Sequence, residues 1–329
     1  MNAFLREIGF AAIVLGLAGV ASAEDVADDR GEVLSYVLDG ADGLVQRFAP
    51  VFLIEHAEEP FNRIGTPSAE IGARGREKVL VDPSHATIYT EVETFATDRD
   101  RYTNLIYRIH FQKNPFTLVP LNVGAGKNVG FIAVITLNSR EEPVWLSTVQ
   151  SCGCYHAIIP TDYLAESAYP DDWNVDDLEV YGEHLPGLLK LKAAAGKNPG
   201  ITITIRGGSH RCMDVAVETD ADATTEVNKV TAEAAPVEAL KHLPLPDGSE
   251  TSFYHEKGHR KGLVKGAYKP LETILFGLWA WDHNVGQDRE YGPKEKVGRR
   301  FYTTLFFARK KEADMWHFAR YLEHNGWKP

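Results

Sequence analysis

Residues 129–149 read VGFIAVITLNSREEPVWLSTV, and this stretch decides the class of fold. It contains two runs rich in β-branched and aromatic side chains, Val129–Leu137 and Val144–Val149, which a polar segment with Pro143 separates. Runs of this composition that are bounded by turn residues predict β-strands. The stretch therefore predicts at least two strands of a sheet.

Runs of the same character extend the predicted sheet in both directions along the chain. Most of them are bounded by Gly, Pro, Asn or Asp, which favour turns. We therefore expect an α+β protein whose body is a large antiparallel or mixed β-sheet, with peripheral helices and an aromatic-rich, partly helical C-terminal region. The further runs are Val51–Ile54, Lys78–Val81, Thr87–Phe95, Asn104–Phe111, Tyr155–Ile159, Ile201–Ile205 and Met213–Val217.

Helical periodicity predicts helices around this sheet. Apolar residues recur at i, i+3 and i+4 spacing within Asp28–Phe48, which predicts a helix at the start of the mature chain. Pro270 suits the first turn of a second helix, and Met315–Leu322 has the apolar face of a third. Asn325 and Gly326 follow the third helix as a stop signal.

The N-terminal residues have the three parts of a secretory signal peptide. The cation Arg6 precedes an apolar run over Phe10–Val20, and small residues occupy Ala21–Ala23. We expect residues 1–23 to be cleaved before Glu24 and the protein to be exported, either to a periplasm or to full secretion. No later apolar run reaches the length of about 18 residues that a transmembrane helix requires, so we expect no transmembrane segment in the mature form.

The composition excludes several classes of protein. The chain of 329 residues is 44% hydrophobic and 25% charged, which excludes a disordered chain and a polytopic membrane protein. Its formal net charge of −11 argues against nucleic acid as a partner. Three cysteines are too few for a disulfide-dense scaffold. These numbers specify no small-molecule or protein partner.

Charge and aromatic content divide the mature chain into three parts. We expect residues 24–218 to form a β-rich body with an N-terminal helix, 219–250 to form a linker or surface excursion, and 251–329 to form an aromatic-rich basic region. The last part holds 15 of the 34 aromatic residues and carries a net charge of +6, whereas residues 1–250 carry −17. We expect the basic region to pack on the acidic body. The alternative is that its surface docks an anionic partner such as a membrane.

A short SCGCYH motif gives the main candidate site. In an extended strand, residues two apart share a face, so Cys152, Cys154 and His156 would point the same way. His210 and Cys212 have the same spacing in a second segment. Cysteine and imidazole ligands suit zinc, and cysteine next to methionine suits copper(I). We expect these five residues to form a Cys/His cluster.

Three alternatives to a metal remain open for the cysteines of this cluster. Cys212 could form a disulfide with Cys152 or Cys154, since export permits disulfides. All three could instead be buried thiols that behave as small hydrophobic residues. Cys152 and Cys154 could also form a strained redox pair. Both the metal and the long-range disulfide require Cys212 to lie close to the other two cysteines.

A second motif, HEKGH, matches the H-E-x-x-H pattern. With Gly262 it resembles part of the metzincin pattern, HExGHxxG, over eight residues. This resemblance implies a zinc hydrolase in which His255 and His259 bind the metal and Glu256 activates water. Lys265 stands where the pattern has its third histidine.

The sequence thus supports three hypotheses of function. The first is an exported protein whose reaction is unidentified and whose best candidate site is the Cys/His cluster, with its catalytic residues unassigned. The second is a zinc-dependent hydrolase that uses the HEKGH motif. The third is a non-catalytic binding or structural protein with a basic aromatic C-terminal surface.

Overall fold

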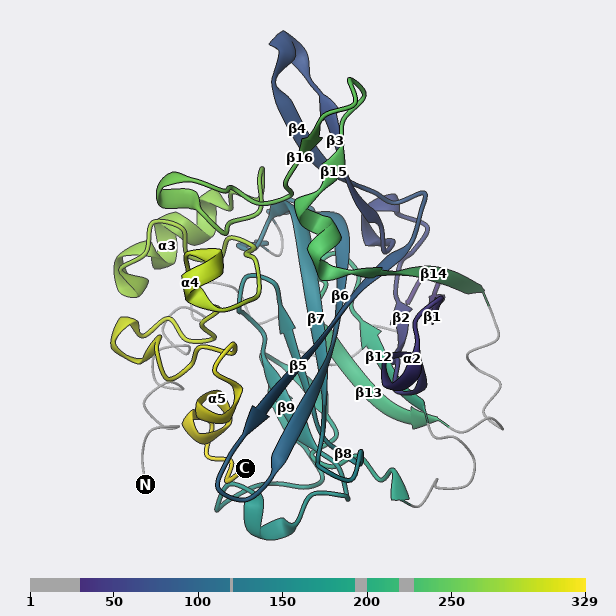
Figure 1. The fold of residues 1–329 in the computed structure, drawn as a ribbon, viewed down its shortest axis with the longest axis vertical. Helices are drawn as coiled ribbons and strands as arrows, with labels where there is room; N and C mark the ends of the chain where they lie inside the picture. The colour runs from purple at the N-terminus through teal and green to yellow at the C-terminus, as the bar shows by residue number, and fades with distance from the viewer. Residues whose placement is uncertain (1–29, 119–120, 193–199, 219–227) are drawn as a thin grey trace.

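The computed structural model describes residues 30–118, 121–192, 200–218 and 228–329, so the predicted signal peptide lies outside the described residues. A ten-stranded sheet forms the body (Figure 1). Its strands are β1 (Leu34–Asp39), β2 (Val51–Ile54), β5 (Thr87–Ala96), β6 (Arg101–Asn114), β7 (Gly126–Leu137), β8 (Pro143–Gln150), β9 (Ala157–Pro160), β12 (Gly200–Ile205), β13 (Cys212–Glu218) and β14 (Lys229–Pro236).

The sheet is mixed, with the strand order β13-β12-β2-β1-β14-β5-β6-β7-β8-β9. Strands β5 to β9 form an antiparallel meander, in which Ile106 of β6 pairs with Val134 of β7. Strand β14 runs parallel to both of its neighbours, β1 and β5, and β12 runs parallel to β2. This arrangement confirms the prediction of a large mixed sheet.

Smaller elements surround the sheet. Three two-stranded sheets pair β3 (Thr66–Ile71) with β4 (Glu77–Asp82), β10 (Leu178–Val180) with β11 (Glu183–Leu185), and β15 (Leu243–Pro244) with β16 (Glu250–Thr251). The α-helices are α2 (Gly43–Arg47), α3 (Pro270–Ala280), α4 (Lys294–Val297) and α5 (Phe318–His324). The 3-10 helices are η1 (Pro60–Asn62), η2 (Ala73–Gly75), η3 (Glu166–Ala168), η6 (Val237–Lys241), η7 (Gly258–Arg260) and η8 (Phe307–Arg309).

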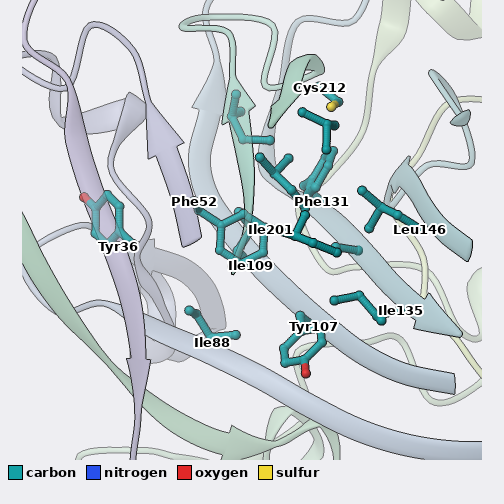
Figure 2. Packing of buried hydrophobic residues seen from close by; sticks show 14 of the residues in the cluster. Tyr36, Phe52, Ile88, Tyr107, Ile109, Phe131, Ile135, Leu146, Ile201 and Cys212 are labelled. Carbon is teal, nitrogen blue, oxygen red and sulfur yellow. The ribbon is translucent and has the colours of Figure 1, made fainter. Parts of the chain in front are cut away.

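The sheet curls so that its two ends share one hydrophobic core. Cys212 from β13 and Leu146 from β8 belong to the same buried cluster, although their strands lie near opposite ends of the strand order. Figure 2 shows Phe52 and Phe131 near the centre of this cluster, and their rings meet edge to face with centroids 6.4 Å apart. Edge-to-face contact is a favoured geometry for aromatic pairs in a core.

The opposite face of β5 to β8 is buried by residues from the C-terminal part of the chain. Trp145 on β8 and Ile132 on β7 pack in a second cluster with Met315, Tyr321 and Trp327. All eight residues of β8 are buried as a result. Strands covered on both faces lack the polar alternation of a half-exposed strand, and this explains the nearly continuous apolar runs in residues 129–149.

Two segments differ from the expected secondary structure. Leu34–Asp39, expected to be helical, forms β1, because Tyr36 and Leu38 enter the core with the period of a strand and the backbone pairs with both neighbours. Only Gly43–Arg47 of that region is helical. Lys229–Pro236, expected to lie in a linker, forms β14 inside the sheet, because backbone hydrogen bonding to two strands compensates for its few large apolar side chains.

Candidate thiol site

The two cysteines of the SCGCYH motif lie on a tight turn that follows β8. The N–H of Gly153 donates to the carbonyl oxygen of Gln150 at 2.8 Å, and the N–H of Gln150 donates to the carbonyl oxygen of Cys154 at 3.0 Å. These bonds reverse the chain and bring the side chains of Cys152 and Cys154 into hydrogen-bonding contact. The pair therefore results from a turn rather than from the extended strand that the spacing suggested.

Glycine is required at the centre of this turn for two reasons. Gly153 has a φ of 92°, which residues with a Cβ rarely adopt. A Cβ at this position would also collide with the carbonyl oxygen of Tyr302. The turn is thus pressed directly against the C-terminal part of the chain.

A buried carboxylate anchors the turn to its surroundings. Oδ1 of Asp288 accepts hydrogen bonds from the N–H of Gly130 at 3.0 Å and from the hydroxyl of Ser151. Its other oxygen lies 3.1 Å from Nζ of Lys269, and the side chains of this ion pair are 1% and 2% exposed. The N–H of Arg289 also donates to the carbonyl oxygen of Ser151 at 2.9 Å.

Lys269 is held in its charged form beside the thiols. Burial by itself lowers the pKa of an ammonium group, but the negative charges of Asp288 and of the Cys152 thiolate raise the pKa of Lys269 well above its ordinary value. The residue immediately precedes α3, so the first turn of that helix fixes its position. A permanent positive charge therefore lies next to the two sulfurs.

The two thiols have different tendencies to ionise. The hydrogen bond from Cys154 lowers the pKa of Cys152, and the charge of Lys269 lowers it further against the opposing effect of burial. The same hydrogen bond and burial raise the pKa of Cys154. One proton is therefore shared between two sulfurs once the pair has lost its first proton.

Acceptors are also present for both protons of the fully reduced pair. The thiol of Cys154 donates to Oε1 of Glu272 on α3 at 3.5 Å. The thiol of Cys152 donates to Oε1 of Gln150 at 3.7 Å. Cys152 is 2% exposed, whereas Cys154 is only partly buried, so Cys154 is the more accessible residue of the pair.

The remaining residues of the predicted cluster each have polar or aromatic contacts of their own. His156 contacts the hydroxyl of Tyr321, with 3.4 Å between the hydroxyl oxygen and Nδ1. His210 is stacked on Phe111, with ring centroids 4.0 Å apart, and its ring nitrogens face two asparagine side chains. The thiol of Cys212 donates to the carbonyl oxygen of its near neighbour Asp214 at 3.6 Å.

All three cysteines are free thiols, so the structure contains none of the disulfides that the sequence left open. Within the part of the chain that the structure describes, no group of three or more His, Cys, Asp and Glu side chains is arranged to hold a metal ion. Binding of zinc or copper(I) by this motif stays a prediction.

The HEKGH motif does not form the helix that a zinc site of this type needs. Gly258 has a φ of 72°, so the backbone cannot continue helically from His255 to His259. Only a short 3-10 turn, η7, begins at Gly258. Two histidines four residues apart share a helical face only where the intervening residues are helical, and that condition is not met here.

Sequence reasoning missed the charged residues around the thiols. Lys269, Glu272 and Asp288 lie more than 110 residues beyond the cysteines in the chain, and no spacing rule connects them to the motif. Lys269 had a single local signal, its position directly before Pro270 at a helix start. That signal predicts that Lys269 precedes a helix, but it does not predict that its side chain is buried beside a thiol.

Comparisons with known proteins add no further assignment. No family model, no curated protein and no solved structure matches this chain. Among the described residues, no helix is both long enough and apolar enough to cross a membrane.

Proposed function

We propose that this protein is an exported thiol–disulfide exchange protein whose redox centre is the pair Cys152 and Cys154. The observation that carries the proposal is the position of two cysteines on one tight turn beside the buried cation Lys269, whose charge lowers the pKa of Cys152. Thiolate is the reactive form of cysteine, and a nearby cation increases its population. The second thiol of the pair can then attack the mixed disulfide and complete the exchange.

The exchange balances as a two-electron reaction with an external disulfide. The Cys152 thiolate takes the proton of Cys154, and the Cys154 sulfur attacks one sulfur of the external disulfide. This step breaks that S–S bond, forms a mixed disulfide and releases the first external thiolate, which takes the proton from Cys152. The thiolate of Cys152 then attacks the Cys154 sulfur, forms the Cys152–Cys154 disulfide and releases the second external thiolate. The two thiol protons end on the released thiolates, so the protein dithiol is oxidised and the external disulfide is reduced.

The neighbouring groups each support one part of this reaction. Glu272 accepts the S–H of Cys154 and so fixes the orientation of that thiol in the reduced pair. Lys269 stabilises the thiolate of Cys152 in both steps. Asp288 positions Lys269 and holds the turn by way of Ser151.

The test is a redox titration of the purified protein with mixtures of reduced and oxidised glutathione. After acid quenching and alkylation, mass spectrometry of peptides should show a Cys152–Cys154 disulfide whose fraction follows the glutathione ratio. Cys152→Ser and Cys154→Ser should each lose this species. Cys212→Ser is the matched control, since its thiol lies outside the pair, and it should titrate like the unmodified protein.

Two outcomes would overturn the proposal. The first is a pair that stays reduced in fully oxidised glutathione while the protein remains folded. The second is an oxidised form in which the disulfide links Cys212 to another cysteine. Because peptide mapping of the Cys212→Ser protein locates the bond directly, the result does not depend on whether the other two variants fold.

A further inference from the structure

Helix α3 exposes large apolar side chains on its outer side. Ile274 is 72% exposed and Leu278 is 83% exposed, and Trp281, which ends the helix, is 81% exposed. Only Glu272, Gly277 and Ala280 of the helix are buried. Isolated exposed apolar residues are common on proteins, but several on one short helix indicate a binding surface.

The segment around η8 continues this surface. Phe306 is 61% exposed and Phe307 is 58% exposed, and the ring of Phe307 lies against that of Trp281 with centroids 5.8 Å apart. Lys310 joins the two segments by donating to the carbonyl oxygen of Ala280 at 2.7 Å. We call this area the α3–η8 surface; its exposed apolar residues are Tyr268, Ile274, Leu275, Leu278, Trp279, Trp281, Leu305, Phe306 and Phe307.

Basic residues are concentrated in the segment that contains η8. Residues 294–311 carry seven Lys and Arg side chains and one Glu, although the whole chain has a net charge of −11. Arg309 and Lys311 follow the exposed phenylalanines and are themselves exposed. Figure 1 shows α3, α4 and α5 together on the side of the sheet away from β1, so the basic segment and α3 share one side of the molecule.

A small basic pocket lies within this region. It has a volume of about 230 Å³, and a single carboxylate, that of Asp282, is surrounded there by cations. Oδ2 of Asp282 lies 3.6 Å from Nζ of Lys310 and 3.8 Å from a guanidinium nitrogen of Arg299. The lining residues are Asp282, Lys294, Gly298, Arg299, Arg300, Tyr302 and Lys310.

The cations of the pocket exceed its negative charge. Burial and the nearby charges of Arg289 and Arg299 lower the pKa of Lys310, although Asp282 opposes this effect. Arg289 and Lys310 also lie over the ring of Tyr302, 4.2 Å and 4.0 Å from its centroid. A pocket with surplus positive charge favours an anionic group such as a phosphate.

We propose that the α3–η8 surface docks on an anionic phospholipid bilayer, with its apolar side chains in the headgroup and acyl boundary and a lipid phosphate in the basic pocket. Tryptophan and phenylalanine next to lysine and arginine are typical of interfacial binding. The acidic remainder of the protein would be repelled by the same bilayer, which would orient the protein with this surface toward the lipid.

Other occupants fit the surface less well. A second copy in a two-fold contact would bring the two basic segments together, and like charges there repel. The apolar N-terminal run, Phe10–Val20, could cover the apolar residues, but it contains no anionic group for the pocket. An anionic bilayer complements both the apolar surface and its charge.

The test is sedimentation of the protein with vesicles of equimolar phosphatidylcholine and phosphatidylglycerol, compared with phosphatidylcholine alone. Binding should require the anionic lipid and should weaken as salt is added. The double variant Ile274→Gln, Leu278→Gln should lose binding by at least about tenfold because it removes apolar insertion. The double variant Arg309→Gln, Lys311→Gln should lose binding by a similar factor, since each basic residue near an anionic surface contributes about 1 kcal/mol.

Val92→Thr is the matched control for loss of exposed apolar area. Val92 is 50% exposed on β5, and its neighbours Glu91 and Glu93 point to the opposite face of that strand. This variant should bind vesicles like the unmodified protein. Cys152→Ser should also bind normally, so the result is independent of the proposed thiol function.

Three outcomes would overturn the docking proposal. One is equal binding to neutral and anionic vesicles, and another is absence of binding to both. The third is a dimer, measured by analytical ultracentrifugation, that the Ile274→Gln, Leu278→Gln variant dissociates, because the surface would then be an interface between copies of the chain.

Discussion

Lys269 and Asp288 form an ion pair that water scarcely reaches, so the stability of the protein should depend on both partners together. Replacing Lys269 by Met leaves the Asp288 carboxylate buried without its cation, and loss of one partner from a buried pair costs about 3–5 kcal/mol of unfolding free energy. We expect urea denaturation of Lys269→Met to show a loss of this size.

The matched control for this prediction is Lys265→Met. Its Nζ lies 3.4 Å from Oε2 of Glu77, but these side chains are 22% and 48% exposed. Exposed pairs contribute about 1 kcal/mol or less, so the control should be close to the unmodified protein. Equal losses of unfolding free energy in the two variants would show that burial does not strengthen the ion pair between Lys269 and Asp288.

The same residues show what sequence can and cannot predict about the site. The spacing of Cys152 and Cys154 was sufficient to select the pair, because only local geometry is needed to bring two residues of one turn together. The position of Cys212 relative to them was not predictable, because the pairing of distant strands determines it. The charged partners on the C-terminal side depend on the same long-range packing.

At the scale of elements, the turn between β8 and β9 gives the next prediction. Gly153→Ala combines a strained φ of 92° with a collision against the carbonyl oxygen of Tyr302. Strain alone costs about 1–3 kcal/mol, and the collision adds to it because the opposing atom belongs to the backbone. We expect a lower unfolding free energy and loss of rapid disulfide formation between Cys152 and Cys154.

Gly248→Ala separates the two contributions. Gly248 has a φ of 86°, and a Cβ there would have no heavy atom within 4 Å. This variant therefore carries the backbone strain without the collision. If both alanine variants lose the same free energy of unfolding, the collision with Tyr302 contributes nothing to the loss in Gly153→Ala.

Elements were predictable where the chain's own pattern agreed with its packing. Residues 129–149 gave β7 and β8 because runs of β-branched residues fit strands buried on both faces. Leu34–Asp39 differs from its predicted helix because its few apolar residues fit both a helical and a strand period, and pairing with β14 decides between them. The small and polar side chains of β14 predict a linker, because they do not reveal a strand whose stability comes from two neighbours.

At the scale of the whole molecule, one histidine lies where the sheet meets the C-terminal part of the chain. His110 on β6 is 0% exposed, and its ring meets that of Phe253 edge to face with centroids 5.1 Å apart. Its Nε2 accepts a hydrogen bond from Nε of Arg108 at 3.1 Å, which requires that nitrogen to be unprotonated. Burial, and after it the charge of Arg108, lower the pKa of His110 well below its ordinary value.

This lowered pKa gives stability a definite dependence on pH. The unfolded chain binds a proton at His110 below about pH 6.5, whereas the folded protein does not, so the contribution of the neutral histidine is complete above that pH. As the pH falls further, the unfolding free energy should decrease by up to about 1.4 kcal/mol per pH unit from this group alone.

His110→Gln keeps an acceptor for Arg108 but cannot titrate. The unfolding free energy of this variant should therefore rise relative to that of the unmodified protein as the pH falls from about 6.5 toward 4. His283→Gln removes an exposed imidazole and is the matched control. Urea denaturation at a series of pH values measures all three proteins, and parallel curves for His110→Gln and the unmodified protein would mean that His110 is not held neutral between the sheet and the C-terminal part of the chain.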